Sequence, residues 1–525
     1  MTTPYDVIVV GAGISGLVAA KTIHQQASQL NLLLLEATYR VGGRTFTVKM
    51  PTAGGTTDSF DLGAQWVGGN HRALASLLKE YGITTFAQHN DGVGRGCIGS
   101  PSVQTFDRLW CKNLMNTDTF KREYKGELGA AELEDISNLF RKLVEAENMI
   151  GDVTDPFGAH PEFAASADAR TLADWGAEIC QTKAGRDVAE LLGRMTYGLP
   201  ANRINFLYHL VYSKASGGSI ALVTMEDDGA QTKRIKGGSQ QVSLRMAAEL
   251  KKAEVEIRHG AVVSKIDTSR LTLPTVTLEN GETLHGRRVI VAIPPNQCAR
   301  LQFSPPLPPL KKRFVDSATP GHMFKFTATF ESRFWVKNGH SGFVTSSVPS
   351  EFRPVSEMYD GTTADGRPAL IGFVHPEAEE RMSAEQRKEA VIQDLVRFLG
   401  PLARTELIAY AEKNWALERF AGGCPVNVMP CGCMDAFMAA RDVHGAVHFA
   451  GTETALENNG YMDGAVQAGL RAAQEVLEAL DPSSSKRSSS LAAVKQESQS
   501  LSFSAASTRT APDRFSSRRS NRSHL

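Results

Sequence analysis

The chain is 525 residues long, and its 57 lysine and arginine side chains balance its 57 aspartate and glutamate side chains. This length predicts two domains rather than one simple core. A net charge of zero favours neither a nucleic acid nor a membrane surface as partner and fits a small-molecule substrate better. Seven cysteines without framework spacing predict reduced thiols in an intracellular compartment. The first apolar run lacks a basic leader, so we expect no secretory signal. The sequence contains no apolar stretch of about 18 residues, so we expect no membrane span.

The first predicted elements are a strand over residues 7–10, a glycine turn and a helix. Gly11 permits the turn, Gly13 lets a pyrophosphate approach the backbone, and Gly16 lets helix and strand pack closely. A second strand, "LNLLLLE", ends at Glu36, twenty residues after Gly16, where a carboxylate can accept hydrogen bonds from a ribose diol. A glycine-rich surface turn, the alternative, would not need this acid. The pattern predicts a dinucleotide-binding βαβ unit, whose phosphates lie at the start of the helix, over Ile14 and Ser15.

The segment "RVGGRTFTV" follows Glu36 almost directly and carries Arg44. By itself it is typical of a basic surface turn. Behind a dinucleotide-binding unit it resembles the second phosphate-binding motif of the flavin-containing amine oxidases, which implies that Arg44 and the glycine backbone engage the FAD diphosphate. An NAD-linked dehydrogenase, the alternative, has no such following element.

The resemblance is to the monoamine oxidase branch of that superfamily, and it recurs over residues 5–480. "FDLGAQWVGG" resembles the loop at the flavin ring, and "GAVVSKID" resembles the segment whose backbone meets the adenine. The most specific block, "VHFAGTETALENNGYMDGAVQAGLRAAQEVL", predicts a strand, a turn and a helix whose positive dipole end faces the flavin. The cofactor-binding residues that these blocks imply are Gly63, Ala64, Gln65, Val262, Gly451, Thr452, Glu453, Tyr461, Met462 and Ala465.

The resemblance implies an α/β fold in which a Rossmann-type FAD-binding domain is interleaved with an α+β substrate-binding domain. We expect the FAD-binding domain over residues 1–85, 233–297 and 412–480, and the substrate-binding domain over 86–232 and 298–411. Residues 481–525 are rich in serine and basic side chains, which predicts a disordered tail. The tail ends in Ser523-His524-Leu525, close to a Ser-Lys-Leu address, so we expect an import receptor as partner and a peroxisomal location, with the cytoplasm as the alternative. A homodimer is left open.

Three cysteines lie close together in "AGGCPVNVMPCGC". Their spacing is not that of a zinc finger and no histidine lies between them, so we expect no metal site. Small buried thiols are expected at Cys431 and Cys433. Cys424 lies in "NWALERFAGGC", which resembles the segment whose cysteine sulfur is bonded to the flavin 8α-methyl group, with Trp415 as its flavin-packing tryptophan. Members of the superfamily also hold FAD without this bond; we expect the thioether.

The segment "GHMFKFTATFESRFW" alternates apolar and polar residues. Its pattern alone predicts a half-buried strand with phenylalanines on one face and a solvated Lys325 on the other. The segment also resembles the active-site strand whose lysine holds a water against flavin N5. We therefore predict that Lys325 is catalytic, together with Tyr461 and Trp415.

The substrate side departs from monoamine oxidases. Tyr461 matches one of the two aromatic rings that flank the path to the flavin, but the other position is Pro425. Gln231 matches a pocket glutamine, Leu222 and Val223 match gating aliphatics, and the acidic run at 226–228 either is a solvated loop or attracts cationic amines. The implied reaction is oxidation of a primary amine, extended or multiply charged, by FAD and O2 to an imine, then aldehyde and ammonia, with hydrogen peroxide. A polyamine or L-amino-acid oxidase and a non-catalytic flavin-bound interaction protein are the alternatives.

Overall fold

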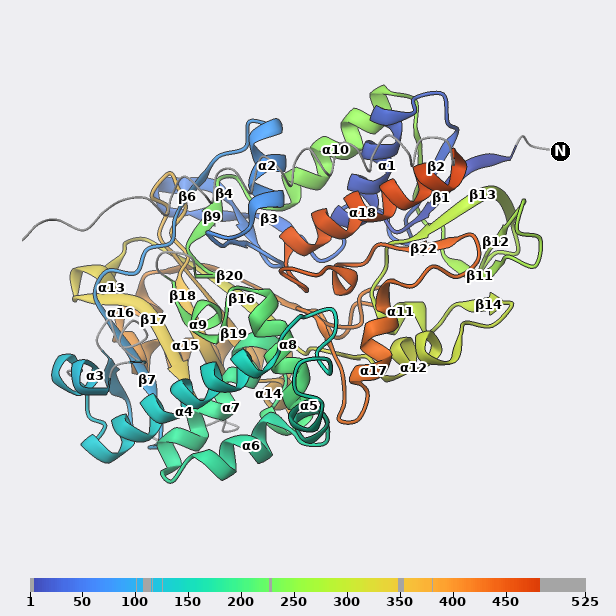
Figure 1. Cartoon of the computed structure of the whole chain (residues 1–525). Coiled ribbons are helices and arrows are strands. Elements are labelled where there is room, and N and C mark those ends of the chain that lie inside the picture. Colours follow the sequence, from blue (N-terminus) through green and yellow to red (C-terminus); the bar gives the residue numbers. More distant parts are fainter. Residues whose placement is uncertain are drawn as a thin grey trace, which may run out of the picture. The chain divides into compact units, whose positions relative to one another are not determined.

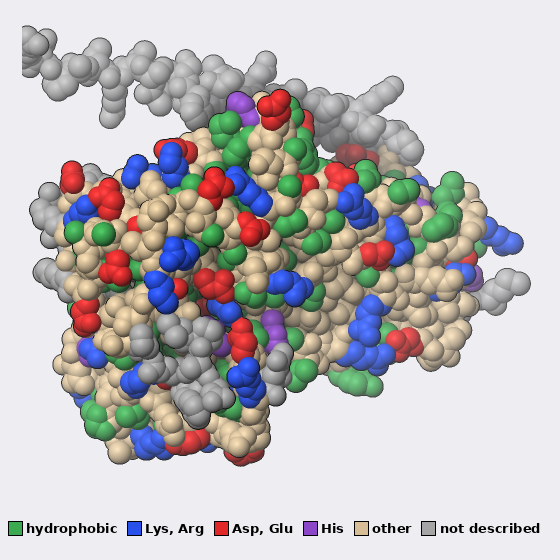
Figure 2. Space-filling model, turned by 90° about the horizontal axis from the view of Figure 1, so that it is seen from below, with side chains coloured by type: hydrophobic (Ala, Val, Ile, Leu, Met, Phe, Trp, Pro, Cys, Tyr) green, Lys and Arg blue, Asp and Glu red, His purple; other side chains and the backbone are tan. Residues whose placement is uncertain are grey.

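The computed structural model describes residues 4–100, 102–106, 115, 117–124, 126–225, 229–347, 354–379 and 381–481. The acidic run at 226–228 and the tail from residue 482, including Ser523-His524-Leu525, lie outside these residues. No helix among the described residues is long and apolar enough to cross a membrane. On the face shown in Figure 2, basic and acidic side chains are intermixed.

The first sheet is built around the predicted N-terminal strand. Its parallel core has the order β10 (Glu256–Arg258), β2 (Leu32–Leu35), β1 (Tyr5–Val10), β13 (Thr283–Val291) and β22 (Val447–Phe449). The last four residues of β1, Val7 to Val10, are apolar and buried, as expected of a strand covered on both faces. Strands from the two ends of the described chain therefore share one parallel sheet.

Two helices cover this sheet side by side (Figure 1): α1 (Ile14–Gln26) directly after the glycine turn, and α18 (Met462–Leu480), which begins where the sequence predicts. A Cβ built on Gly469 of α18 would lie 2.5 Å from the Ser15 carbonyl oxygen, so a small residue is required for this close approach. An antiparallel extension of β13 follows through β12 (Thr275–Leu278) and β11 (Val263–Asp267), and β14 (Gln302–Ser304) is parallel to β11.

The second sheet has seven strands in the order β20-β16-β19-β18-β17-β7-β8. Their bounds are β20 (Leu407–Asn414), β16 (Phe324–Phe330), β19 (Ala369–Val374), β18 (Val355–Asp360), β17 (His340–Ser346), β7 (Val93–Cys97) and β8 (Gln104–Phe106). The phenylalanines of β16 pack in one apolar cluster with α15 (Ala384–Leu399). This is the apolar face that the alternation predicts.

The opposite face of β16 is not solvated, contrary to what the alternation alone predicts. All seven residues of β16 are buried. Lys325 donates hydrogen bonds to the loop at residues 63–65, and the Thr329 hydroxyl donates to the Pro51 carbonyl oxygen at 2.8 Å. Segments from the N-terminal part of the chain thus cover the polar face, which a periodicity of two cannot reveal.

The remaining elements surround these sheets. Three small sheets pair β3 (Thr47–Thr52) with β4 (Thr56–Asp61), β9 (Lys233–Ile235) with β5 (Trp66–Val67) and β6 (Thr85–Ala87), and β15 (Thr319–Pro320) with β21 (Asn427–Val428). The other helices are α2 (Arg72–Glu80), α3 (Thr117–Glu123), α4 (Ala130–Met149), α5 (Pro161–Asp168), α6 (Leu172–Ile179), α7 (Lys183–Tyr197), α8 (Phe206–Ala215), α9 (Ser219–Val223), α10 (Gln240–Lys252), α11 (Pro295–Cys298), α12 (Pro309–Ser317), α13 (Phe334–Lys337), α14 (Pro376–Glu379), α16 (Leu402–Thr405) and α17 (Met434–Met438).

The predicted domain boundaries fall close to the ends of these sheets. β14 belongs to the first sheet although it lies beyond the predicted boundary at residue 297, and β20 of the second sheet crosses the boundary at 412. The described residues up to Ala473 form one compact unit. The division into two domains at those boundaries therefore stays a prediction.

Candidate active site

A cavity of about 440 Å³ is lined both by the N-terminal glycine turn and by strands of the second sheet. This volume lies in the range of small-molecule and cofactor sites. Nearly all the cofactor-binding residues that the sequence predicts line it; Gly16 and Glu453 are the exceptions. The cavity therefore joins the two sheets at the predicted site.

The glycine turn has the geometry that a bound pyrophosphate needs. Gly11 has a φ of +101°, and a Cβ built on it would lie 2.9 Å from the Ala292 carbonyl oxygen. A Cβ built on Gly16 would lie only 1.9 Å from the Gly11 carbonyl oxygen, so Gly16 serves the packing of helix on strand. A Cβ on Gly13 would meet no atom within 4 Å, which leaves open space beside the backbone where the cavity meets the start of α1.

Glu36 lies buried at the end of β2 and lines the cavity. Its carboxylate accepts hydrogen bonds from the Ala12 backbone N–H at 2.9 Å, and from the backbone N–H and the hydroxyl of Thr38 at 2.8 and 2.7 Å. These donors fix the carboxylate beside the glycine turn. A carboxylate has about four lone-pair sites, so capacity for a further donor remains.

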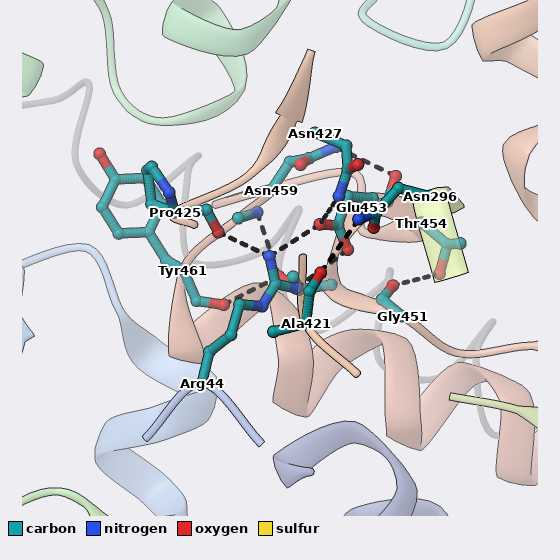
Figure 3. A network of polar contacts seen from close by, with 12 residues as sticks. Arg44, Asn296, Ala421, Pro425, Asn427, Gly451, Glu453, Thr454, Asn459 and Tyr461 are labelled. Atoms are coloured by element: carbon teal, nitrogen blue, oxygen red, sulfur yellow. Dashed lines mark hydrogen bonds and ion pairs between the residues drawn. The ribbon is translucent and has the colours of Figure 1, made fainter. Parts of the chain in front are cut away.

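Arg44 is held by a buried ion pair with Glu453, as Figure 3 shows. Its two terminal nitrogens donate to the two carboxylate oxygens at 2.9 and 3.2 Å, and one also donates to the Pro425 carbonyl oxygen at 2.6 Å. Burial raises the pKa of Glu453, but Arg44 and a hydrogen bond from Asn427 outweigh it and hold the pKa below its usual value. The guanidinium is therefore fixed in the cavity wall by a carboxylate behind it.

At the other end of the cavity, Lys325 meets the loop at residues 63–65. Its Nζ donates hydrogen bonds to the Gly63 carbonyl oxygen at 2.8 Å and to Gln65 Oε1 at 2.6 Å. Gln65 Nε2 is buried and has no hydrogen-bond partner among the described residues. Trp415 stands against the same loop, with its indole N–H donating to the Leu62 carbonyl oxygen at 2.8 Å. This end of the cavity therefore keeps one buried donor unpaired.

Burial lowers the pKa of Lys325 to about 7, although the charge of Asp61 raises it. Its Nζ lies 5.6 Å from the ring centroid of Trp66 and 5.9 Å from that of Phe373. A lysine in such surroundings can hold or give up a proton near neutral pH.

A family model for flavin-containing amine oxidoreductases matches residues 14–477 of this chain. The chain belongs to that family. A flavin-containing amine oxidase of Oncorhynchus mykiss is 33% identical over 90% of this chain and 86% of its own length, and flavin-containing amine oxidase B of Homo sapiens is 30% identical over 91% and 87%. Among solved structures, cyclohexylamine oxidase from Brevibacterium oxydans has a TM-score of 0.80 and putrescine oxidase bound to putrescine one of 0.76; each is 28% identical, covering 91% of this chain and all of its own.

The amine oxidase is thus an FAD-dependent oxidoreductase that uses O2, with a Rossmann-type FAD-binding domain interleaved with an α+β substrate-binding domain. The residues of the cavity fit this cofactor. Open backbone beside Gly13 suits a diphosphate, and the unpaired Gln65 Nε2 is a donor for a polar ring edge.

Of the six cysteines that the structure describes, only Cys424 lines the cavity. Burial raises the pKa of its thiol to about 12. Cys433 is buried, as expected, but the prediction that Cys431 is buried is wrong. Cys431 and Gly432 form an exposed turn ahead of α17, and Gly432 takes a φ of +73°, so the chain reverses at the surface there.

The structure brings most of the predicted substrate residues together. Tyr461, Pro425, Leu222 and Gln231 line the cavity, and the Thr452 hydroxyl donates to the Tyr461 carbonyl oxygen at 2.9 Å. Val223 does not line the cavity and packs against the main apolar cluster instead.

Sequence reasoning missed Glu357, Tyr359 and Phe373, which also line the cavity. An acidic residue in a short strand usually faces solvent, and the alternation in "VSEMYD" is weak. The sequence offered no usable signal, because a bulge between Val355 and Glu357 breaks the alternation and places Val355 on the opposite face of the sheet.

Proposed function

We propose that the enzyme oxidises primary amines, preferably extended or multiply charged ones, to imines that hydrolyse to aldehyde and ammonia, with hydrogen peroxide as second product. The observation that carries this proposal is Lys325, buried in the cavity and bonded to the loop at residues 63–65. The bound flavin supplies the acceptor for two electrons. The amine oxidases named above, including those of cyclohexylamine and putrescine, support an amine as substrate.

The cavity wall prepares the amine for reaction. Only a neutral amine has the lone pair that the oxidation needs, whereas a free alkylammonium has a pKa of about 10.4, like lysine. Burial lowers the pKa of Lys325 to about 7, so the same surroundings favour the neutral form of a substrate amine. We propose that Lys325 holds a water molecule beside the reacting carbon and exchanges a proton with it, while Trp415 and Tyr461 shape the site.

A peroxide-coupled assay over monoamines, diamines, polyamines and L-amino acids tests the proposal. We expect peroxide from primary amines in stoichiometry with aldehyde and ammonia. Peroxide from L-amino acids alone would assign the amino-acid alternative, and a flavin-loaded protein that turns over none of these compounds would support the interaction protein.

We also propose that the FAD is bonded covalently to the Cys424 sulfur. Support comes from the position of Cys424, the one described cysteine in the cavity wall. Denaturation with acid should leave the yellow chromophore on the polypeptide in the wild type and release it from Cys424→Ala. Cys433→Ala is the matched control and should keep the chromophore; free FAD from the denatured wild type would contradict the thioether.

Import into peroxisomes through Ser523-His524-Leu525 is a further proposal, supported by the sequence of the tail and by the peroxide product. A fluorescent protein carrying the last twelve residues should become punctate and coincide with a peroxisomal marker. Deleting Leu525 is the control and should make it diffuse, and diffuse fluorescence from the intact fusion would reject this address.

A further inference from the structure

Glu357 lies in one row with Lys325 across the second sheet. In the antiparallel ladders Lys325 of β16 pairs with Phe373 of β19, which pairs in turn with Glu357 of β18. Directly paired residues project from the same face, and all three line the cavity. Because neighbouring strands lie about 4.8 Å apart, the backbones of Lys325 and Glu357 are separated by about 10 Å.

The Glu357 carboxylate is buried without a cation. Its exposed fraction is 4%, and Oε2 accepts a hydrogen bond from the Tyr359 hydroxyl at 2.7 Å. It forms no ion pair among the residues that the structure describes. Burial raises the pKa of Glu357 to about 7, against the lowering effect of Tyr359. An ionised carboxylate in such a place is costly unless a positive charge pairs with it.

Aromatic rings line the space between the two groups. Trp66 lies edge to face with Tyr359 at 5.0 Å between ring centroids, and 6.2 Å from Phe373. Such rings contact methylene groups well and also stabilise a nearby ammonium. The cavity wall between Lys325 and the Glu357 carboxylate is therefore aromatic, and the two groups are separated by the width of about two strands.

A purely structural role does not explain why an ionisable carboxylate is buried at position 357. The hydrogen bond to Tyr359 joins residues on the same strand, so it ties no separate elements together. Glutamine could accept the same bond without the cost of a buried charge. The ionisable group thus serves something that enters the cavity.

We propose that Glu357 is the distal subsite of the cavity and binds the second ammonium group of an aliphatic diamine, while the first amino group is oxidised beside Lys325. This inference rests on the proposed oxidation of amines and names its substrate class. The two cationic ends of such a chain match the carboxylate at one end of the row, and its methylene groups match the rings between.

The test compares putrescine with n-butylamine, which has the same carbon chain and one amino group. In the wild type we expect the kcat/KM of putrescine to exceed that of n-butylamine. Glu357→Gln should lower the value for putrescine by about 10- to 100-fold, the range of a charged hydrogen bond, and leave n-butylamine nearly unchanged. Glu389→Gln, which removes an exposed carboxylate paired with Arg404, is the control and should change neither value.

Glu357→Asp gives a second, independent readout. The carboxylate is withdrawn by one methylene, so the preferred diamine should lengthen by one, from putrescine towards cadaverine. Flavin absorbance and thermal midpoint serve as checks of folding for both variants.

The outcomes separate the two proposals. A wild type that oxidises no amine of the panel refutes the proposed function, whereas one that oxidises other primary amines but not putrescine overturns the diamine subsite alone. A wild type that oxidises n-butylamine, with a putrescine to n-butylamine ratio that Glu357→Gln leaves unchanged, overturns the diamine subsite alone. An unchanged optimum chain length in Glu357→Asp overturns it as well.

Discussion

The two ends of the cavity are built in different ways. At the glycine-turn end, the residues that shape the site follow one another closely in the sequence, from Gly11 to Arg44. Glu36 and Arg40 bond within this segment, and the Arg44 guanidinium is paired with Glu453. At the Lys325 end, the wall comes from three strands whose pairing joins distant segments, and both Gln65 Nε2 and the Glu357 carboxylate lack a full set of partners. One end is completed by the protein and the other by its ligand.

The difference has an energetic reason. A buried polar group without a partner costs about 1–3 kcal/mol, and a buried charge costs more. Fixed charges such as Arg44 and Glu453 therefore occur as a pair. Gln65 Nε2, which is buried beside Lys325 without a hydrogen-bond partner among the described residues, carries that cost in the free protein, and a ligand that accepts its hydrogen bond would remove the cost.

The largest expected effect is that of Lys325→Met. Turnover should fall by about 10²- to 10⁴-fold, since a positioned proton-handling group is lost, while flavin content stays at the wild-type level. Stopped-flow reduction by an amine and the absorbance ratio of flavin to protein measure the two quantities. Lys413→Met, on the neighbouring strand β20, is the matched control; equal turnover in both variants would return Lys325 to a structural role.

The second effect tests the glycine-turn end. Glu453→Gln leaves Arg44 buried without its anion, which should lower the free energy of unfolding by about 3–5 kcal/mol and reduce flavin content. Arg313→Gln, which breaks an exposed ion pair with Asp435, should cost less than about 1 kcal/mol. Thermal midpoints compare the stability of the two variants, and the absorbance ratio of flavin to protein gives their flavin content. Equal losses of stability would show that the buried ion pair contributes no more than the exposed one.

The third effect is a pH dependence at the Lys325 end. The pKa of Glu357 is about 7 in the fold and about 4.5 as a free side chain. A carboxyl whose pKa is raised in the folded state binds its proton more tightly there than in the unfolded chain. Its contribution to the free energy of unfolding is therefore fully present below the unfolded pKa of about 4.5 and is lost as the pH rises through the folded pKa of about 7. The shift corresponds to about 3 kcal/mol.

Glutamine does not ionise, so the Glu357→Gln variant does not lose stability as the pH rises through 7. Its stability relative to the wild type should therefore grow between about pH 5 and pH 8, measured without amine. Added putrescine should stabilise the wild type at pH 8 and reduce the difference. A difference that stays constant with pH would show that Glu357 ionises as it does in water.

The smallest effect concerns Pro425. Pro425→Tyr should supply a second aromatic ring opposite Tyr461 and raise the kcat/KM of benzylamine relative to n-butylamine by about 2- to 10-fold, the worth of one aromatic contact. The Pro425 carbonyl oxygen, which accepts from Arg44, is retained in this variant. An unchanged ratio would mean that the second wall of the cavity is made elsewhere.

The sequence predicts the glycine-turn end well because its signals are local. A strand, a turn with glycines at fixed positions and an acid at the end of the next strand can be read without knowing the rest of the fold. Lys325 was different: its alternating pattern points to solvent, and only the family resemblance placed it in the site. The reason is that its strand is central in a sheet whose polar face is covered by a segment about 260 residues away.

Glu357 could not be predicted at all, because its burial depends on the register of β18 against β19. Register follows from which strands pair, and periodicity within one strand does not contain that information. The exposure of Cys431 likewise follows from a surface turn whose position only the fold defines.

The ion pair of Arg44 with Glu453 joins residues 409 positions apart, and it has a consequence for biosynthesis. A ribosome adding about 5–20 residues per second emits Glu453 roughly 20–80 s after Arg44. Throughout that interval the nascent glycine turn and Arg44 are present while β22 and the start of α18 are not. Loading of FAD must therefore wait until translation of the catalytic region is nearly complete, and a nascent chain halted before Glu453 should carry no flavin, whatever the supply of cofactor in the cell.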